Sequence, residues 1–175
     1  MVYLINNLLH WSRIQQGAIQ PKFNKIKLYD VAEREFELLF TAANNKKIDL
    51  INAIDFDTFA YGDGEMISTV IRNLVSNAIK FTPNEGNVSV GSKEDGAMIL
   101  ISITDTGVGM PKEVAEKLFQ INNEIQRNGT AGEKGTGLGL VICKDFVEQN
   151  KGKIWVESTI DVGTTFYFTV PKFSE

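Results

Sequence analysis

The spacing of apolar and polar residues along the chain predicts a mixture of helices and strands. Apolar residues at helical spacing predict amphipathic helices at residues 3–16, 28–47, 63–82, 111–119 and 138–149. Alternating or short apolar runs predict strands at residues 48–54, 59–62, 152–158 and 164–170, and a hairpin at 86–105 that turns at Glu94–Gly96. These elements do not alternate as regular βαβ units. The pattern therefore favours an α+β fold, a two-layer sandwich of one sheet on helices.

Two of the predicted helices carry further signals. Asp30, with Glu33 three residues later, predicts an N-cap for the helix at residues 28–47. Gly17 and Pro21 end the first helix. Its apolar stripe is prominent for a helix set apart by such a break, and we expect it to pack against something outside this chain. The stripe consists of Leu4, Leu8, Trp11 and Ile14.

Composition and charge exclude several classes of function. The chain has 175 residues and a net charge of −4, which gives no electrostatic basis for nucleic-acid binding. Its longest apolar run, residues 98–103, is far shorter than a membrane span, and no signal-peptide pattern opens the sequence. The single cysteine, Cys143, fits a reducing compartment and is predicted to be a buried, inert thiol. We therefore expect a cytoplasmic globular domain.

The helix predicted at residues 63–82 has a polar stripe opposite its apolar side. At about 100° per residue, Asn73, Asn77 and Lys80 fall within roughly a 60° arc. Carboxamide oxygens can ligate Mg²⁺, and a lysine one turn later can contact phosphate oxygens. The alternative is an ordinary polar face turned to solvent.

The segment "DTGVGM" follows the most hydrophobic predicted strand. Gly107 and Gly109 permit a tight turn and leave room for a flat ring to approach the backbone. Asp105 can accept a hydrogen bond from an exocyclic amino group, such as that of adenine. An ordinary strand-to-helix turn has the same composition, so this motif alone does not decide between the two.

Glycines are crowded in "GEKGTGLGL", residues 132–140, at the start of the last predicted helix. The order of a P-loop is missing because Lys134 precedes its glycine, and the G-x-G-x-G spacing differs from a dinucleotide-binding fingerprint. Backbone N–H groups around Gly135, Gly137 and Gly139 can instead meet phosphates at a helix N-terminus. The alternative is a flexible linker.

Several short motifs, taken in order, resemble the nucleotide-binding motifs of the GHKL superfamily. More narrowly, they resemble the ATP-binding catalytic domain of two-component sensor histidine kinases, over residues 25–173. "LLHWSRIQQG" resembles the end of the dimerisation and phosphotransfer helix before that domain. The resemblance implies a Bergerat-type fold, a mixed sheet covered by three helices, for residues 25–175, with residues 1–24 as a helical remnant. The motifs are "NLVSNAIKFT", "DTGVGM", "LFQ", "GTGLGL" and "DVGTTF".

The resemblance implies a role for each matching residue. Asn77 would ligate Mg²⁺ with Asn73 assisting, and Lys80 would contact phosphate. Phe81 would lie against the nucleotide, and Asp105 would accept the adenine amino hydrogen. The other implied ATP-binding positions are Gly107, Gly109, Phe119, Gly135, Thr136, Gly137, Leu138, Gly139, Leu140 and Thr165.

The family's ATP lid corresponds to the stretch from Phe119 to Lys134, and this stretch departs from the family pattern. Ile121 and Ile125 stand where a second aromatic residue is usual. The basic residue often found there is missing, although Arg127 or Lys134 can reach the phosphates. Asp161 stands where glycine is common in the last motif. These departures bear on lid closure more than on ATP binding.

The resemblance favours phosphoryl transfer to a protein nucleophile over hydrolysis. Related ATPases carry a glutamate general base four residues before the Mg²⁺-binding asparagine, and this chain has Asn73 there. The single histidine, His10, lacks the residues that follow the family's phosphoacceptor. We therefore expect the acceptor histidine on a dimerisation domain outside this chain.

The expected function is that of a protein-histidine kinase catalytic domain that binds Mg-ATP. Its implied partners are the dimerisation domain of its parent protein and a response regulator downstream. We expect the fragment to be a monomer, and the parent to be a homodimer that can be anchored in the inner membrane. Two alternatives stay open: a GHKL-type regulatory module without phosphotransfer, and an ATP-hydrolysing GHKL ATPase.

Overall fold

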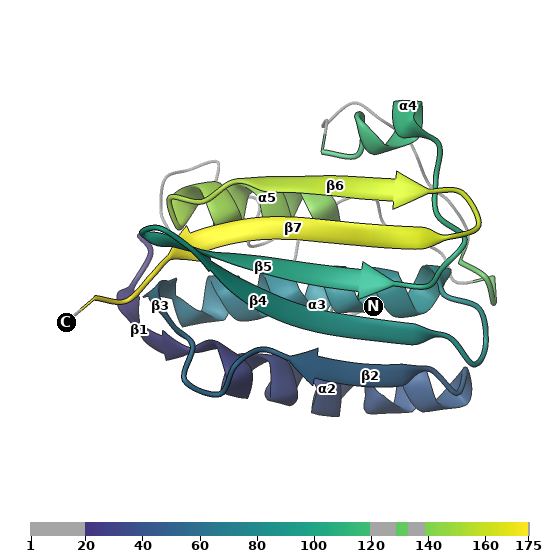
Figure 1. The fold of residues 1–175 in the computed structure, drawn as a ribbon, viewed down its shortest axis with the longest axis horizontal. Coiled ribbons are helices and arrows are strands. Elements are labelled where there is room, and N and C mark those ends of the chain that lie inside the picture. Colours follow the sequence, from purple (N-terminus) through teal and green to yellow (C-terminus); the bar gives the residue numbers. More distant parts are fainter. Residues whose placement is uncertain (1–19, 120–128, 133–138, 175) are drawn as a thin grey trace.

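The structure is a computed structural model that describes residues 20–119, 129–132 and 139–174. A five-stranded sheet forms the front layer in Figure 1, and α2, α3 and α5 cover its rear face. This two-layer arrangement confirms the predicted α+β fold class. The helices are α2 (Leu28–Asn45), α3 (Gly64–Phe81), the short α4 (Lys112–Ala115) and α5 (Gly139–Gln149). The strands are β1 (Phe23–Lys27), β2 (Asp49–Ala53), β3 (Phe59–Asp63), β4 (Asn87–Asp95), β5 (Met98–Asp105), β6 (Ile154–Thr159) and β7 (Gly163–Pro171).

The large sheet is mixed, as predicted. Its strands lie in the order β2-β4-β5-β7-β6. β2 runs parallel to β4, and the other neighbouring pairs are antiparallel. The predicted hairpin is the β4–β5 pair, and Gly96 in its turn has a φ of 60°, a left-handed conformation that glycine adopts without strain. This order brings the end of β5 to the centre of the sheet.

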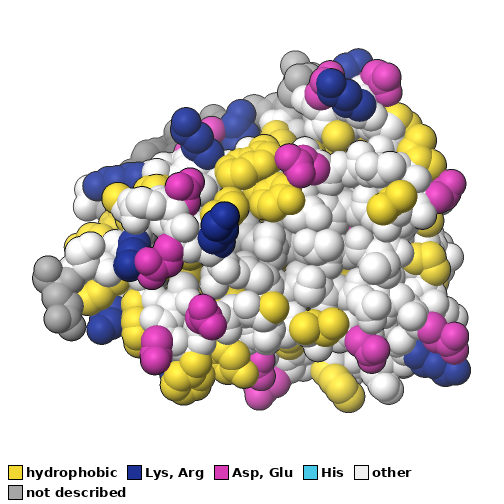
Figure 2. All heavy atoms as spheres, in the orientation of Figure 1, with side chains coloured by type: hydrophobic (Ala, Val, Ile, Leu, Met, Phe, Trp, Pro, Cys, Tyr) yellow, Lys and Arg dark blue, Asp and Glu magenta, His cyan; other side chains and the backbone are white. Residues whose placement is uncertain are grey.

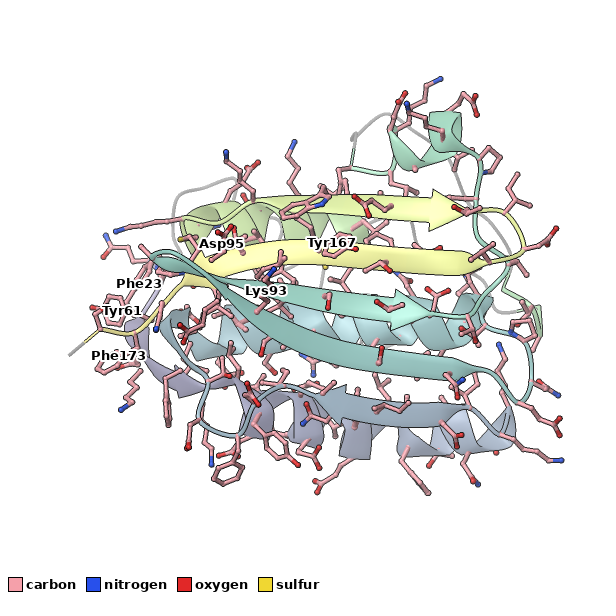
Figure 3. The ribbon with its side chains drawn as sticks, in the orientation of Figure 1. Phe23, Tyr61, Lys93, Asp95, Tyr167 and Phe173 are labelled. Carbon is pink, nitrogen blue, oxygen red and sulfur yellow. The ribbon has the colours of Figure 1, made fainter. Side chains whose placement is uncertain are left out.

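Aromatic side chains close the small β1–β3 sheet onto the rest of the molecule. The ring centroids of Phe23 and Tyr61 are 5.5 Å apart, and those of Tyr61 and Phe173 are 6.4 Å apart. Figure 3 shows the three rings side by side. The backbone N–H of Phe173 donates to the carbonyl of Phe59 at 2.9 Å. The segment after β7 therefore continues along β3.

Alternation along the strands decides which side chains reach the core. In β5, Ile99, Ile101 and Ile103 are buried on the helix side of the sheet. The opposite face is open, and Figure 2 shows a group of apolar side chains on it over β6 and β7. Trp155 and Tyr167 stack on that face, with ring centroids 5.3 Å apart. The main core therefore lies between the sheet and the three long helices.

The helix α3 is the central helix of the rear layer. Its N-cap is Asp63, whose carboxylate accepts hydrogen bonds from the N–H groups of Glu65 and Met66 at 3.0 and 3.1 Å. The helix packs between α2 and α5 and against β5. Cys143 on α5 is fully buried against it, and burial raises the pKa of that thiol, which confirms the prediction of a buried residue.

Three local predictions were wrong or incomplete. Of the helix predicted at residues 111–119, only the short α4, Lys112–Ala115, is helical. α2 begins at Leu28, so Asp30 is not its N-cap but lies in the first turn, 3.6 Å from the ammonium of Lys27. Strand β1 was not predicted, because only Ile26 among its residues is buried. The helix predicted at residues 3–16 lies outside the described residues. Within the described ranges, no helix combines the length and the apolar character needed to cross a membrane.

Candidate functional site

The polar stripe of α3 faces the beginning of α5. The side-chain amide of Asn73 is nearly buried, and its Nδ2 donates to the carbonyl of Thr69 at 3.0 Å. This bond directs the amide oxygen away from the helix backbone. A Cβ placed on Gly139, the first residue of α5, would lie 3.2 Å from that Oδ1. Asn77 and Lys80 follow on the next turns and are half-buried.

The donor set of the stripe fits a hard divalent cation. Amide oxygens are among the ligands that Mg²⁺ accepts, together with water and phosphate oxygens. Asn73 presents its oxygen at the place where α3 and α5 meet, and Asn77 lies one turn further along the helix. Lys80 adds a positive charge, with its Nζ 4.8 Å from the centroid of the Phe81 ring. These residues can hold Mg²⁺ between the protein and an anionic ligand.

The carbonyls in the C-terminal turn of α3 bind its own C-cap and distant segments of the chain. A helix leaves its last four carbonyls without partners inside the helix, so other groups must satisfy them. The carbonyl of Ala78 accepts from the N–H and the hydroxyl of Thr82, at 3.0 and 2.7 Å. That of Phe81 accepts from the N–H of Val108 at 3.1 Å. The two carbonyls between them accept from a buried ammonium, that of Lys46.

Asp105 ends β5 as a buried carboxylate. Its Oδ1 accepts from the N–H groups of Gly107 and Thr164, at 2.8 and 3.2 Å. Burial raises the pKa of this carboxyl to about 6, although both backbone hydrogen bonds oppose the rise. Since both backbone donors use Oδ1, Oδ2 is the oxygen suited to an amino group of a ligand. A carboxylate in this setting is an oriented hydrogen-bond acceptor.

The two glycines after Asp105 allow close approaches of the backbone. A Cβ on Gly107 would lie 2.6 Å from both Asp105 Oδ1 and the carbonyl oxygen of Phe81. Gly109 has a φ of 62°, and its Cβ would collide with the carbonyl of Thr159. The glycines therefore let the loop lie against the end of α3 on one side and the end of β6 on the other.

Of the other residues predicted to bind the nucleotide, two pack against the core and one lies on the opposite face of the sheet. The ring of Phe119 packs edge-on against Phe166, with centroids 6.3 Å apart, and Leu140 packs against the core. Thr165 does not lie beside Asp105: its hydroxyl lies 3.1 Å from that of Thr104 on the open face of the sheet. Side chains alternate along β7, so the neighbouring residue 164 takes the helix-side position. Thr165 is therefore replaced in the candidate site by its neighbour.

Several predicted positions lie outside the described residues. They are His10, Ile121, Ile125, Arg127, Lys134, Gly135, Thr136, Gly137 and Leu138. The departure at Asp161 is within the described part of the chain. Its φ is 58°, a left-handed conformation that glycine adopts freely and that aspartate tolerates better than most residues. Its N–H donates to the carbonyl of Val108 at 2.9 Å, so Asp161 contacts the loop that follows Asp105.

Sequence reasoning missed three residues that the structure places around the site. Thr164 holds Asp105, and Lys46 and Thr130 hold the end of α3. The alternation of β7 indicates only that the side chain of Thr164 lies on the helix side, whereas its bond to Asp105 uses the backbone N–H. Lys46 and Thr130 meet across 84 positions of sequence, and no local pattern indicates that contact.

Comparison with known proteins shows which proteins the chain is similar to. Residues 62–174 match the family described as histidine kinase-, DNA gyrase B-, and HSP90-like ATPase. The adaptive-response sensory kinase SasA of Gloeothece citriformis is 41% identical over 172 residues, which is 97% of this chain and 43% of that protein. The chain spans between 19% and 45% of the first curated relatives that it matches.

Solved structures share the fold of the chain. The nucleotide-free catalytic domain of the histidine kinase ThkA has a TM-score of 0.74 at 29% identity, over 86% of this chain and 96% of that one. Full-length ShkA in complex with AMPPNP has a TM-score of 0.83 at 24% identity, over 99% of this chain and 36% of that one. The likeness to ShkA is one of fold.

Proposed function

The chain belongs to the family of histidine kinase-, DNA gyrase B- and HSP90-like ATPases, and we propose that it binds Mg-ATP and phosphorylates a histidine of its parent protein. It is the ATP-binding catalytic domain of a sensor histidine kinase. In the proposed reaction the bond between the β,γ-bridging oxygen and the γ-phosphorus breaks, and a bond from the histidine nitrogen to that phosphorus forms. ADP leaves with the bridging oxygen.

One observation supports a single ligand spanning the whole site. The hydrogen bond from Val108 N–H to the Phe81 carbonyl, at 3.1 Å, fixes the Asp105 loop to the turn of α3 that carries Lys80. An oriented acceptor and a cation-binding stripe are thereby held on two connected segments. A nucleoside triphosphate has the matching order of groups, an amino-bearing ring at one end and phosphates at the other.

On the base side, we propose that Asp105 Oδ2 accepts a hydrogen bond from the adenine amino group. Gly107 and Gly109 keep side chains out of the space where the ring lies, and Phe81 lies against the nucleotide. Thr164 holds the carboxylate through its N–H at 3.2 Å. These groups bind and orient the base, and they take no part in breaking bonds.

On the phosphate side, we propose that Asn77 ligates Mg²⁺ and that Asn73 assists. Bound Mg²⁺ supplies positive charge to the phosphate oxygens. Lys80 contacts phosphate directly, and the N-terminus of α5 at Gly139 lies beside the Asn73 amide. Phosphoryl transfer depends mainly on positioning and on charge stabilisation, which are the properties that these residues provide.

The stripe favours transfer over hydrolysis. A water molecule would need a general base, and Asn73 is a carboxamide that does not accept a proton at neutral pH. The proposed nucleophile is a histidine of the dimerisation domain, with residues 1–24 as the end of that domain's helix and residues 25–175 as the catalytic domain. Transfer onward to a response regulator belongs to the parent protein.

Phosphorylation in trans tests this proposal. The chain is incubated with Mg²⁺ and ATP labelled in the γ-phosphate, together with the phosphoacceptor domain of its parent. We expect an acid-labile, base-stable label on that domain and little free phosphate. ATP binding without label transfer would favour a regulatory module, and rapid release of phosphate without transfer would favour an ATPase.

A further inference from the structure

A buried ammonium group ties the end of α3 to a distant turn. Lys46 is 7% exposed. Its Nζ donates to the carbonyls of Ile79 and Lys80, at 2.8 and 3.2 Å, and to the hydroxyl of Thr130 at 2.6 Å. An ammonium has three protons to donate, and each of these oxygens can accept one. The positive charge also lies at the C-terminus of a helix, where the helix dipole stabilises it.

The backbone around Lys46 is itself fixed. Lys46 is the C-cap of α2, and its N–H donates to the carbonyl of Ala43 at 3.1 Å. Its own carbonyl accepts from the N–H of Glu85 at 2.9 Å. Hydrogen bonds of its backbone N–H and C=O therefore fix the position from which the Lys46 ammonium reaches α3.

Thr130 lies in a compact turn that binds the same helix end. The N–H of Gly132 donates to the carbonyl of Gly129 at 3.0 Å and closes the turn. The N–H of Thr130 donates to the carbonyl of Lys80 at 3.0 Å. Its hydroxyl oxygen lies 3.2 and 3.0 Å from the carbonyls of Lys80 and Thr82. One threonine thus uses both its backbone and its side chain to hold the last turn of α3.

We propose that Lys46 and Thr130 are positioning residues for the phosphate side of the nucleotide. The clasp formed by Lys46 and Thr130 holds the turn at residues 129–132 against the carbonyl of Lys80. This inference rests on the proposed function, in which the side chain of Lys80 contacts the phosphates. The base side is held separately, by the bond from Val108 to Phe81. Loosening the clasp should therefore weaken phosphate binding and spare adenine binding.

Titrations of ATP and adenosine into the full chain test this division. Thr130→Val removes the hydroxyl but keeps the backbone bond to Lys80, and Lys46→Met removes the ammonium. We expect each variant to raise the Kd for Mg-ATP by about 2- to 10-fold, an effect of the size of one net hydrogen bond, because the substitutions act on the phosphate side through the end of α3. The Kd for adenosine should stay within about twofold. Thr41→Val, at an exposed position on α2, is the matched control and should change neither value.

The double variant separates the clasp from a general loss of stability. Both substitutions break the same Lys46–Thr130 bond, and each also removes contacts of its own, so the double variant should lose less Mg-ATP affinity than the sum of the two single losses. Additive losses, or equal losses for ATP and adenosine, would overturn the inference. If Lys46→Met does not fold, unchanged ATP affinity in Thr130→Val would overturn it alone. Wild-type chain that binds neither ligand would refute the proposed function itself.

Discussion

Asp105→Asn should make the chain more stable and at the same time unable to bind adenine tightly. The substitution keeps the shape of the side chain and an oxygen that can accept from Gly107 and Thr164, now at 2.8 and 3.2 Å. It replaces the outward oxygen by an NH₂ group. That group donates, so it cannot accept from the adenine amino group.

The expected gain in stability comes from the pKa of Asp105. Burial raises this pKa from its ordinary value of 3.8 to about 6, so ionisation is harder in the folded chain than in the unfolded chain. Stability is lost as the pH rises from about 4 through 6, and above that range the penalty is about 3 kcal/mol. Asparagine carries no charge to desolvate. At pH 7.5 the variant should therefore be more stable by up to about 3 kcal/mol.

The expected loss in affinity comes from the missing acceptor. A hydrogen bond to a charged group contributes about 1.5–3 kcal/mol, so the Kd for adenosine should rise about 10- to 150-fold. Urea unfolding measures the first effect, and calorimetric titration with adenosine measures the second. Asp95→Asn is the matched control, because Asp95 is exposed at the β4–β5 turn (Figure 3). The control should change neither quantity.

Two outcomes would contradict these roles of Asp105. Unchanged adenosine affinity in Asp105→Asn would show that the carboxylate does not contact the base. A variant that is less stable than the wild-type chain at pH 7.5 would show that the folded site favours the ionised carboxylate. That result would contradict the raised pKa of Asp105.

Two further predictions concern the same loop. Gly107→Ala places a methyl group 2.6 Å from the Phe81 carbonyl oxygen, so we expect a loss of about 1–3 kcal/mol in urea unfolding and weaker adenosine binding. Gly64→Ala, whose Cβ would have 3.9 Å to its nearest neighbour, is the control, and equal behaviour of the two would contradict the packing of the loop. Adenosine affinity should also depend on pH, because protonated Asp105 loses an acceptor. It should fall about 10-fold between pH 7 and 5, and a flat profile would exclude titration of this carboxyl.

The sequence predicted the elements with long periodic patterns and missed those that depend on distant contacts. The helix α3 was found because its apolar side spans its whole length, and the β4–β5 hairpin was found from its alternation and its turn. Strand β1 has one buried residue, so its five residues carry no alternation. Asp30 fits an N-cap locally, but the N–H of Leu28 already bonds to Thr58, and the helix begins there.

In the candidate site, too, residues in local motifs were predicted and residues that depend on distant contacts were missed. Asn73, Asn77, Lys80 and Asp105 belong to local motifs, and the structure brings their segments together at the end of α3. The choice of Thr165 followed from its place in a motif and not from the side of the strand on which it lies. Lys46 and its partner are isolated polar residues in the sequence, and only the folded chain places them on one helix end.

The coupling of Mg²⁺ to ATP binding is the sharpest test of whether the α3 stripe is the metal and phosphate side of the site. Calorimetric titrations of ATP with and without Mg²⁺ are run on the wild-type chain and on Asn77→Ala, with adenosine as the reference ligand. We expect Mg²⁺ to tighten ATP binding in the wild-type chain, Asn77→Ala to lose this tightening, and both chains to bind adenosine equally. Equal Mg²⁺ dependence in the two chains would contradict the assignment of the α3 stripe as the metal and phosphate side of the site.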